Sequence, residues 1–301
     1  MIGPAATPEL LEYARRAPWD ALSSAVREIG SVRDARAVPF LTDCLASQNW
    51  RVTIAAEDAL GLQGRDAESA LPALRTVERG HWLPSAREGA TAARMRIEGR
   101  RPAQTLREPP DPVGRCAFSH PETENWKANS DMDTATPEGW WAARVLKRYP
   151  SADRYITHPV GGGVVVGINE GGEYGADLLW VTREYEEVVL KDTQRIFAFE
   201  RLDWGLLLLQ GHGSVGQISV LTQDKNGRWT VRPIVELTAA PWAFRTLPDG
   251  GIAVATEYDG TLLIDRRGTV KGFECHEVRP SSWPKDHPKG SRTGLYFSIP
   301  H

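Results

Sequence analysis

The 301-residue sequence predicts an α+β fold of two domains, with an N-terminal α-solenoid at residues 1–100 and an antiparallel all-β domain at residues 116–301. Three observations predict this division. Residues 1–100 are rich in alanine and repeat with a period near 32 residues. From residue 160, short apolar runs alternate with glycine turns, as in all-β domains. Residues 101–115 are rich in proline, which cannot continue a helix, and we expect a linker there.

The helical prediction depends on an internal repeat. Trp19, Trp50 and Trp82 recur at intervals of 31 and 32 residues, and each opens a helical pattern. The segments Ala25–Gly30 and Ala56–Gly61 align with each other, and an Arg-Asp-Ala string follows both. A period near 32 with two helices per unit is typical of an α-solenoid, and residues 1–100 have room for about three units.

The residues of one unit also fit a packed helix. Apolar residues fall on a single helical stripe at Val52, Ala55, Ala56, Ala59 and Leu60. Thr7, Pro8 and Glu9 form a helix-start pattern, with Thr7 as the N-cap. We expect Gly30 and Gly61 to take the left-handed position just past a helix end. The three tryptophans are expected to pack in the core or against a helix start, with a ligand cage as the alternative.

The stretch from Trp50 to Gly61 resembles the HEAT-repeat family, in particular its short bacterial type also seen in phycobilisome-lyase-like proteins. The resemblance covers about a third of the chain and implies a helical repeat fold. HEAT-like enzymes that bind iron use His-Glu pairs on repeated helices. Residues 1–100 contain a single histidine, His81, so the resemblance carries over no iron site. We therefore expect no metal and no cofactor.

Apolar runs continue from Val164 to Phe273 in the second half of the chain. Turn signals such as Asn226-Gly227 and Arg267-Gly268 separate them. Gly163, Gly205 and Gly251 each precede a predicted strand, 42 and 46 residues apart, and about four strands fit each interval. This period resembles the blades of a β-propeller.

Three such units are recognisable, whereas closed propellers typically have four or more blades. Either residues 151–160 and the segment Leu295–Ile299 complete a degenerate blade, or the sheet arrangement is open. A helix-start pattern at Thr136-Pro137-Glu138 predicts one further helix at about residues 137–148, packed at the junction of the two domains.

Composition narrows the functional class. The net charge is −3, which disfavours nucleic-acid and membrane binding because phosphate affinity requires concentrated lysine and arginine. The N-terminal residues lack the pattern of a signal peptide, and no apolar run approaches a membrane span. Cys44, Cys116 and Cys275 cannot all pair with one another, which suits a reducing compartment. We therefore expect a cytoplasmic protein.

Three short strings resemble nucleotide- or metal-binding motifs, but each is better explained as an ordinary structural segment. The segment Gly211–Gly216 fits a dinucleotide fingerprint, but a strand is predicted after it where a helix is required, so we expect a glycine-rich hairpin. The string Asn129, Asp131, Asp133 lacks the glycine and glutamate of a calcium loop. Adjacent residues in a strand point to opposite faces, which argues against a metal site at Cys275-His276-Glu277.

Aromatic and charged residues gather at predicted turns and strand ends of the β domain, where binding residues usually lie. The candidate partner-binding residues are Asp203, Trp204, His212, Trp242, Glu257, Tyr258 and Asp259. Sealing between neighbouring sheets is the alternative role of these aromatic residues.

The sequence favours a non-catalytic module that binds another protein, because repeats are present without a catalytic constellation. It resembles immunity proteins that neutralise a toxin by direct binding. One alternative is a hydrolase-like enzyme that uses carboxylates such as Asp203, Glu257 and Asp259. Another is a scaffold with several partners, and the sequence does not specify an oligomeric state.

Overall fold

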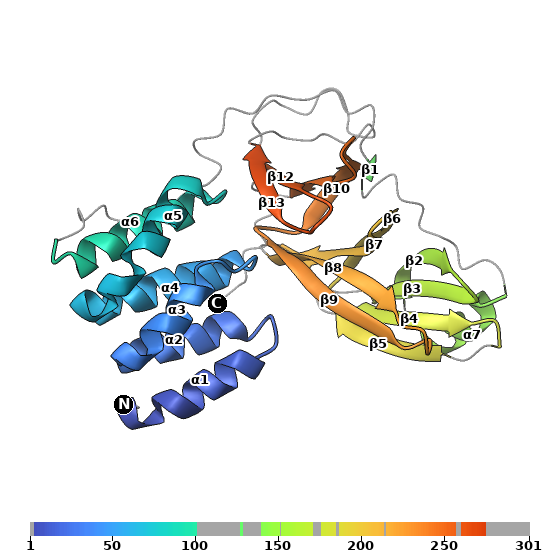
Figure 1. Cartoon of the computed structure of the whole chain (residues 1–301). Coiled ribbons are helices and arrows are strands. Elements are labelled where there is room, and N and C mark those ends of the chain that lie inside the picture. The colour runs from blue at the N-terminus through green and yellow to red at the C-terminus, as the bar shows by residue number, and fades with distance from the viewer. Residues whose placement is uncertain are drawn as a thin grey trace, which may run out of the picture.

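The computed structural model describes residues 3–100, 127–128, 140–150, 152–170, 176–184, 187–213, 215–256 and 260–274. It confirms a helical N-terminal half followed by antiparallel sheets (Figure 1). Residues 101–115, predicted as a linker, lie outside the described residues. Among the described helices, none is long and apolar enough to cross a membrane.

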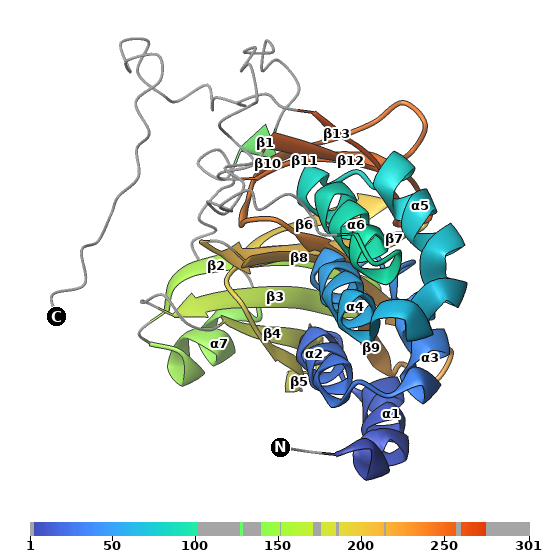
Figure 2. The ribbon, with the colours of Figure 1, turned by 90° about the vertical axis from the view of Figure 1, so that its left-hand side faces the viewer.

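Residues 3–100 form three helix pairs. The α-helices are α1 (Thr7–Arg16), α2 (Leu22–Val32), α3 (Val38–Cys44), α4 (Trp50–Gln63), α5 (Leu71–Gly80) and α6 (Pro84–Ile97). Short 3-10 turns precede the first helix of each pair, at Pro4–Ala6, Ala35–Ala37 and Gly64–Ala70. Figure 2 shows two helical layers, with α1, α3 and α5 in one and α2, α4 and α6 in the other. This is the layered stacking that the repeat predicts.

The predicted apolar stripe of α4 is buried at every position, from Val52 to Leu60. Two local predictions were wrong. The N-cap of α1 is Ala6, and Thr7 is a buried residue of the first helical turn. Gly30 and Gly61 do not end helices, because α2 continues to Val32 and α4 to Gln63.

The left-handed residues after α2 and α4 are Arg33 and Gly64, with φ of 54° and 59°. Gly30 and Gly61 instead allow α2, α4 and α6 to approach one another closely, and we call the layer of these three helices the inner layer. A Cβ atom on Gly30 would lie 2.5 Å from Cβ of Ala59, and one on Gly61 would lie 3.3 Å from Cα of Ala93. The repeated glycine therefore sets the spacing between successive units.

The second half consists of three antiparallel sheets, each built from four consecutive strands. The first contains β2 (Ala152–Val160), β3 (Gly163–Glu170), β4 (Ala176–Thr182) and β5 (Glu187–Thr193). The second contains β6 (Ile196–Leu202), β7 (Gly205–His212), β8 (Val215–Gln223) and β9 (Trp229–Leu237). The third contains β10 (Pro241–Thr246), β11 (Ile252–Thr256), β12 (Gly260–Ile264) and β13 (Val270–Glu274), and β1 (Lys127–Ala128) pairs with β10.

The spacing of Gly163, Gly205 and Gly251 matches this architecture, because each lies at the start of the second strand of its sheet. The second sheet packs against both neighbours, and the run Leu206–Leu209 is fully buried between them. Among the described strands no sheet closes on itself, and the strand order does not form a ring. Residues 152–160 form the first strand of the first sheet, whereas Leu295–Ile299 lies outside the described residues.

The additional helix is α7 (Ala142–Arg148), and residues 137–139 lie outside the described part of the chain. Its buried residues Trp141 and Val145 pack against β2, β3 and β4 of the first sheet. The helix therefore covers that sheet and lies away from the helical half (Figure 1), not at the domain junction as expected.

Candidate functional site

The three repeated tryptophans lie along one edge of the solenoid, and this edge joins the β half. Trp19 lies in the turn between α1 and α2, Trp50 begins α4 after the α3–α4 turn, and Trp82 lies between α5 and α6. Each is only partly buried. We call Trp19, Trp50, Trp82 and their turns the tryptophan edge. A 32-residue period places the same turn of each unit at the same end of the stack, which aligns the three indoles.

The first two indoles of the tryptophan edge contact β9, the outer strand of the second sheet. Trp19 Nε1 donates to Glu236 Oε2 at 3.0 Å, and Trp50 Nε1 donates to the carbonyl oxygen of Leu237 at 3.3 Å. Arg51 Nε donates to the other carboxylate oxygen of Glu236 at 3.2 Å. The Arg51 guanidinium also lies 4.6 Å from the ring centre of Trp50. A buried carboxylate is thereby held by two donors from different repeats.

The third indole contacts the third sheet. Trp82 packs against the solenoid core and also against the core shared by the second and third sheets. From the neighbouring turn, Gln48 Oε1 accepts a hydrogen bond of 3.5 Å from the backbone N–H of Val270, the first residue of β13. The tryptophan edge thus covers outer strands of two sheets, which otherwise expose unpaired backbone groups.

The expected packing is confirmed for two of the tryptophans, because Trp50 and Trp82 pack against the solenoid core and Trp50 begins α4. Trp19 and Trp50 also form hydrogen bonds to the β half, which the sequence did not predict. Their hydrogen-bond partners lie 217 and 187 residues away in the sequence. The sequence contains one signal for a contact of these tryptophans outside the solenoid. An indole N–H recurs at the same turn of three repeats and needs three hydrogen-bond acceptors. Helices offer few acceptors, because their backbone groups are already paired with one another.

His81 stacks on Trp82 with ring centres 5.5 Å apart. Its Nδ1 accepts the backbone N–H of Leu83 at 3.0 Å, and Arg87 donates to its carbonyl oxygen at 2.6 Å. Burial lowers the pKa of the His81 imidazole to about 4, and the nearby Arg87 charge acts in the same direction. The imidazole is therefore neutral at pH 7, with its proton on Nε2.

Acidification is expected to destabilise the protein through His81. The unfolded chain binds a proton near the ordinary pKa of 6.5, whereas the folded chain does so only near 4. The contribution of this group to stability is therefore complete above pH 6.5 and is lost as the pH falls toward 4. His81→Asn keeps an acceptor for Leu83 without titrating. Chemical denaturation at several pH values should show a shallower pH dependence in this variant, and an unchanged slope would exclude His81 as the titrating group.

The predicted partner-binding residues are distributed over several places in the β half. Asp203 and Trp204 occupy the β6–β7 turn, and Trp204 Nε1 donates to the carbonyl oxygen of Gly250 at 2.9 Å. This contact joins a turn of the second sheet to a turn of the third. His212 ends β7, and Trp242 lies on β10. The segment at residues 257–259 (Glu257, Tyr258 and Asp259) lies outside the described residues, so the grouping of these carboxylates with Asp203 stays a prediction.

The segment Gly211–Gly216 lies in the hairpin between β7 and β8, with His212 paired to Val215, and not in a strand–loop–helix turn. In the part of the chain that the structure describes, no group of three or more His, Cys, Asp or Glu side chains is placed to hold a metal ion. Cys44 is buried on α3, and burial raises the pKa of its thiol to about 11, so it is a poor nucleophile at neutral pH. Residues 129–133 and 275–277 lie outside the described ranges.

A second surface lies on the inner helical layer. In the aligned repeats, Arg27 of α2 and Asp58 of α4 occupy equivalent exposed positions. One turn further along α4, Leu62 is 44% exposed, and Arg96 of α6 lies 3.9 Å from Asp58 between Nη1 and Oδ1. We call the surface bearing Arg27, Asp58, Leu62 and Arg96 the open face. The described hydrogen bonds to the β half come from the tryptophan edge and the adjacent Arg51, and the four residues of the open face take no part in them.

Comparison with known proteins agrees with the helical architecture. The family model described as HEAT repeats matches residues 7–93, which run from α1 into α6. No curated protein and no solved structure matched the chain. The match covers the helical part alone, which is similar to HEAT repeats and is followed by a separate antiparallel β region.

Proposed function

We propose that the protein is a non-catalytic protein-binding module that uses the open face to hold a protein partner. The observation that carries the proposal is the mode of attachment of the solenoid. The described hydrogen bonds join the β half to inter-helix turns at one edge, and none of them involves the open face on the helical surface, the kind of surface that solenoids generally use for binding. HEAT repeats suggest such an interaction or scaffold role.

The open face has the mixed character of a protein interface. Leu62 is one of few large apolar side chains among the described residues that are more than a third exposed. The same helical layer exposes Arg27, Asp58 and Arg96, which carry charges of both signs. An exposed apolar group within a polar rim is typical of a surface that binds protein. The β6–β7 turn, with Asp203 and Trp204, is proposed as a second and separate contact region of the β half.

The partner class that we favour is a toxin or effector protein, which this chain would neutralise by direct binding in the cytoplasm of a bacterium. The design as a compact two-part binder supports this choice by analogy with immunity proteins. Affinity capture from the native host, followed by mass spectrometry, identifies the partner. Expression of that partner alone should then arrest growth, and co-expression of this chain should restore it. A partner that is harmless when expressed alone would exclude the immunity role and leave a scaffold role.

Leu62→Glu is expected to weaken partner capture at least about tenfold, because it places a charge where the partner would bury an apolar group. Tyr13→Glu is the matched control, since Tyr13 is 57% exposed on α1, outside the inner layer. Both variants should retain wild-type helicity by circular dichroism. Equal capture by both variants and wild type would show that the open face does not bind the partner.

A further inference from the structure

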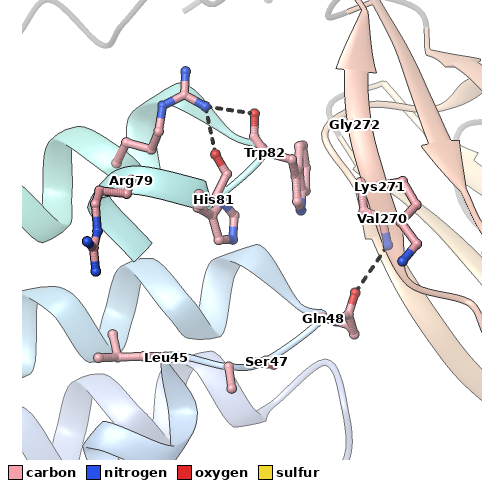
Figure 3. Close-up of a pocket in the computed structure, with 12 residues that line it drawn as sticks. Leu45, Ser47, Gln48, Arg79, His81, Trp82, Val270, Lys271 and Gly272 are labelled. Carbon is pink, nitrogen blue, oxygen red and sulfur yellow. Dashed lines mark hydrogen bonds between the residues drawn. The ribbon is translucent and has the colours of Figure 1, made fainter. Parts of the chain in front are cut away.

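A pocket of about 390 Å³ lies where the two halves of the molecule meet. Its walls are the turn between α3 and α4, the turn between α5 and α6, and the outer strand β13 (Figure 3). Two successive repeats and the third sheet therefore contribute to one concavity beside the tryptophan edge. None of the candidate partner-binding residues lines it.

The charged groups that line the pocket are all basic: Arg79, Arg87 and Lys271. Lys271 Nζ lies 3.2 Å from Asp265, which is not part of the lining. Within the described residues, Arg79 donates through Nε to the carbonyl oxygen of Arg75, and Arg87 donates through Nη1 to backbone oxygens of the His81–Trp82 turn. Neither guanidinium forms an ion pair with a described carboxylate, so both retain N–H groups for a ligand.

The neutral polar side chains of the pocket have their acceptor atoms occupied by backbone N–H groups. Ser47 Oγ accepts from Asn49 N–H at 3.1 Å, Gln48 Oε1 accepts from Val270 N–H, and His81 Nδ1 accepts from Leu83 N–H. Each of these side chains keeps a donor that no described acceptor occupies: the hydroxyl hydrogen of Ser47, the amide NH₂ of Gln48 and the Nε2–H of the neutral His81 imidazole. Such a pocket offers hydrogen-bond donors and positive charge to whatever enters it.

We propose that this pocket binds a polyvalent oxyanion, a molecule that carries two or more carboxylate or phosphate groups. Oxygen anions accept hydrogen bonds without needing to donate any, which matches the remaining polar groups. Figure 3 shows Arg79 at one side of the pocket and Lys271 at the other, with His81 and Gln48 between them. Because positive groups lie at both ends of the pocket, an anion with two separated charged groups should bind more tightly than a small single ion.

The pocket lies between the solenoid and the β half, so a ligand bound in it affects how firmly the two halves associate. Arg79 and His81 belong to the solenoid, whereas Lys271 belongs to β13. An anion that contacts both sides is bound only when the halves are in contact, so it stabilises that arrangement by mass action. This proposal does not depend on the protein partner of the open face.

Isothermal titration calorimetry of the full chain at low ionic strength tests the site with three probes: citrate, inorganic pyrophosphate and hexaglutamate. We expect one-to-one saturable binding of at least one probe. Preference for citrate or pyrophosphate indicates a small metabolite, and preference for hexaglutamate indicates an acidic protein segment. Absence of saturable binding of all three would overturn the proposal.

Arg79→Gln and Lys271→Gln should each weaken the binding of the preferred probe about tenfold, since each removes a charged donor. Arg15→Gln is the matched control, because it removes an exposed arginine of α1 that belongs neither to the pocket nor to the open face, and it should leave the affinity unchanged. Equal weakening by the control would reveal nonspecific charge attraction and contradict the site. Arg87 is left intact because its hydrogen bonds hold the His81–Trp82 turn.

Discussion

Glu236→Ala is expected to lower the free energy of unfolding by about 2–3 kcal/mol, because it leaves two donors without their acceptor. Glu236 is 6% exposed, and its two oxygens accept from Trp19 and Arg51. Arg51 is about one-third exposed at its side chain and regains water when the carboxylate is removed, so the loss is smaller than for a fully buried pair. Urea denaturation followed by far-ultraviolet circular dichroism measures the change.

A double-mutant cycle measures the interaction energy of the Arg51–Glu236 ion pair separately from the other contacts of the two residues. Arg51→Ala and Glu236→Ala should together cost less than the sum of the single changes, because the ion pair is lost only once. The same variants should speed proteolysis at the joint and raise the radius of gyration in small-angle X-ray scattering. Additive energies with an unchanged radius would mean that the Glu236 contacts do not hold the halves together.

Gly30→Ala is expected to destabilise the protein by about 2 kcal/mol, although alanine is ordinarily favoured over glycine within a helix by about 1 kcal/mol. The added Cβ would lie 2.5 Å from Cβ of Ala59 and 2.8 Å from its Cα, so α2 and α4 must move apart. Since the open face spans both helices, the same change should weaken partner binding. Thermal denaturation gives the sign of the effect directly.

Gly80→Ala supplies the matched control. Gly80 is the last residue of α5, and a Cβ there would meet no heavy atom within 4 Å. This variant should be stabilised by about 0.5 kcal/mol through reduced freedom of the unfolded chain. Ala59→Gly in the Gly30→Ala background should recover part of the loss by removing one of the colliding atoms. Stabilisation by Gly30→Ala would show that the helices are not in close contact at this position.

The helical part was predictable because the sequence patterns that specify it recur within short stretches of the chain. The Ala-rich stripe of α4 and the recurrence of Trp19, Trp50 and Trp82 repeat within one short period, and each repeat packs mainly on its neighbours. The role of Gly30 was misjudged because a glycine near a helix end satisfies two requirements equally well in sequence. Only the position of Ala59 on the next helix distinguishes close packing from a left-handed cap.

The β half was predictable in its units and less so in its assembly. Glycine turns and apolar runs marked three groups of strands, which the structure contains. The placement of α7 depends on which sheet covers Trp141, and that is a contact between segments with no shared pattern. The joint at Glu236 was missed for the same reason, since its partners belong to the first and second repeats, far away in sequence.

Attachment along the tryptophan edge has a mechanical consequence. A free solenoid behaves as a soft spring, whose pitch and curvature vary because each unit touches only its neighbours. Here every unit is also fastened to a stiff pleated body by its own indole, so stretching or coiling requires contacts at all three turns to break. The curvature of the solenoid is therefore fixed before a partner binds to the helices, so the solenoid loses less conformational entropy when the complex forms.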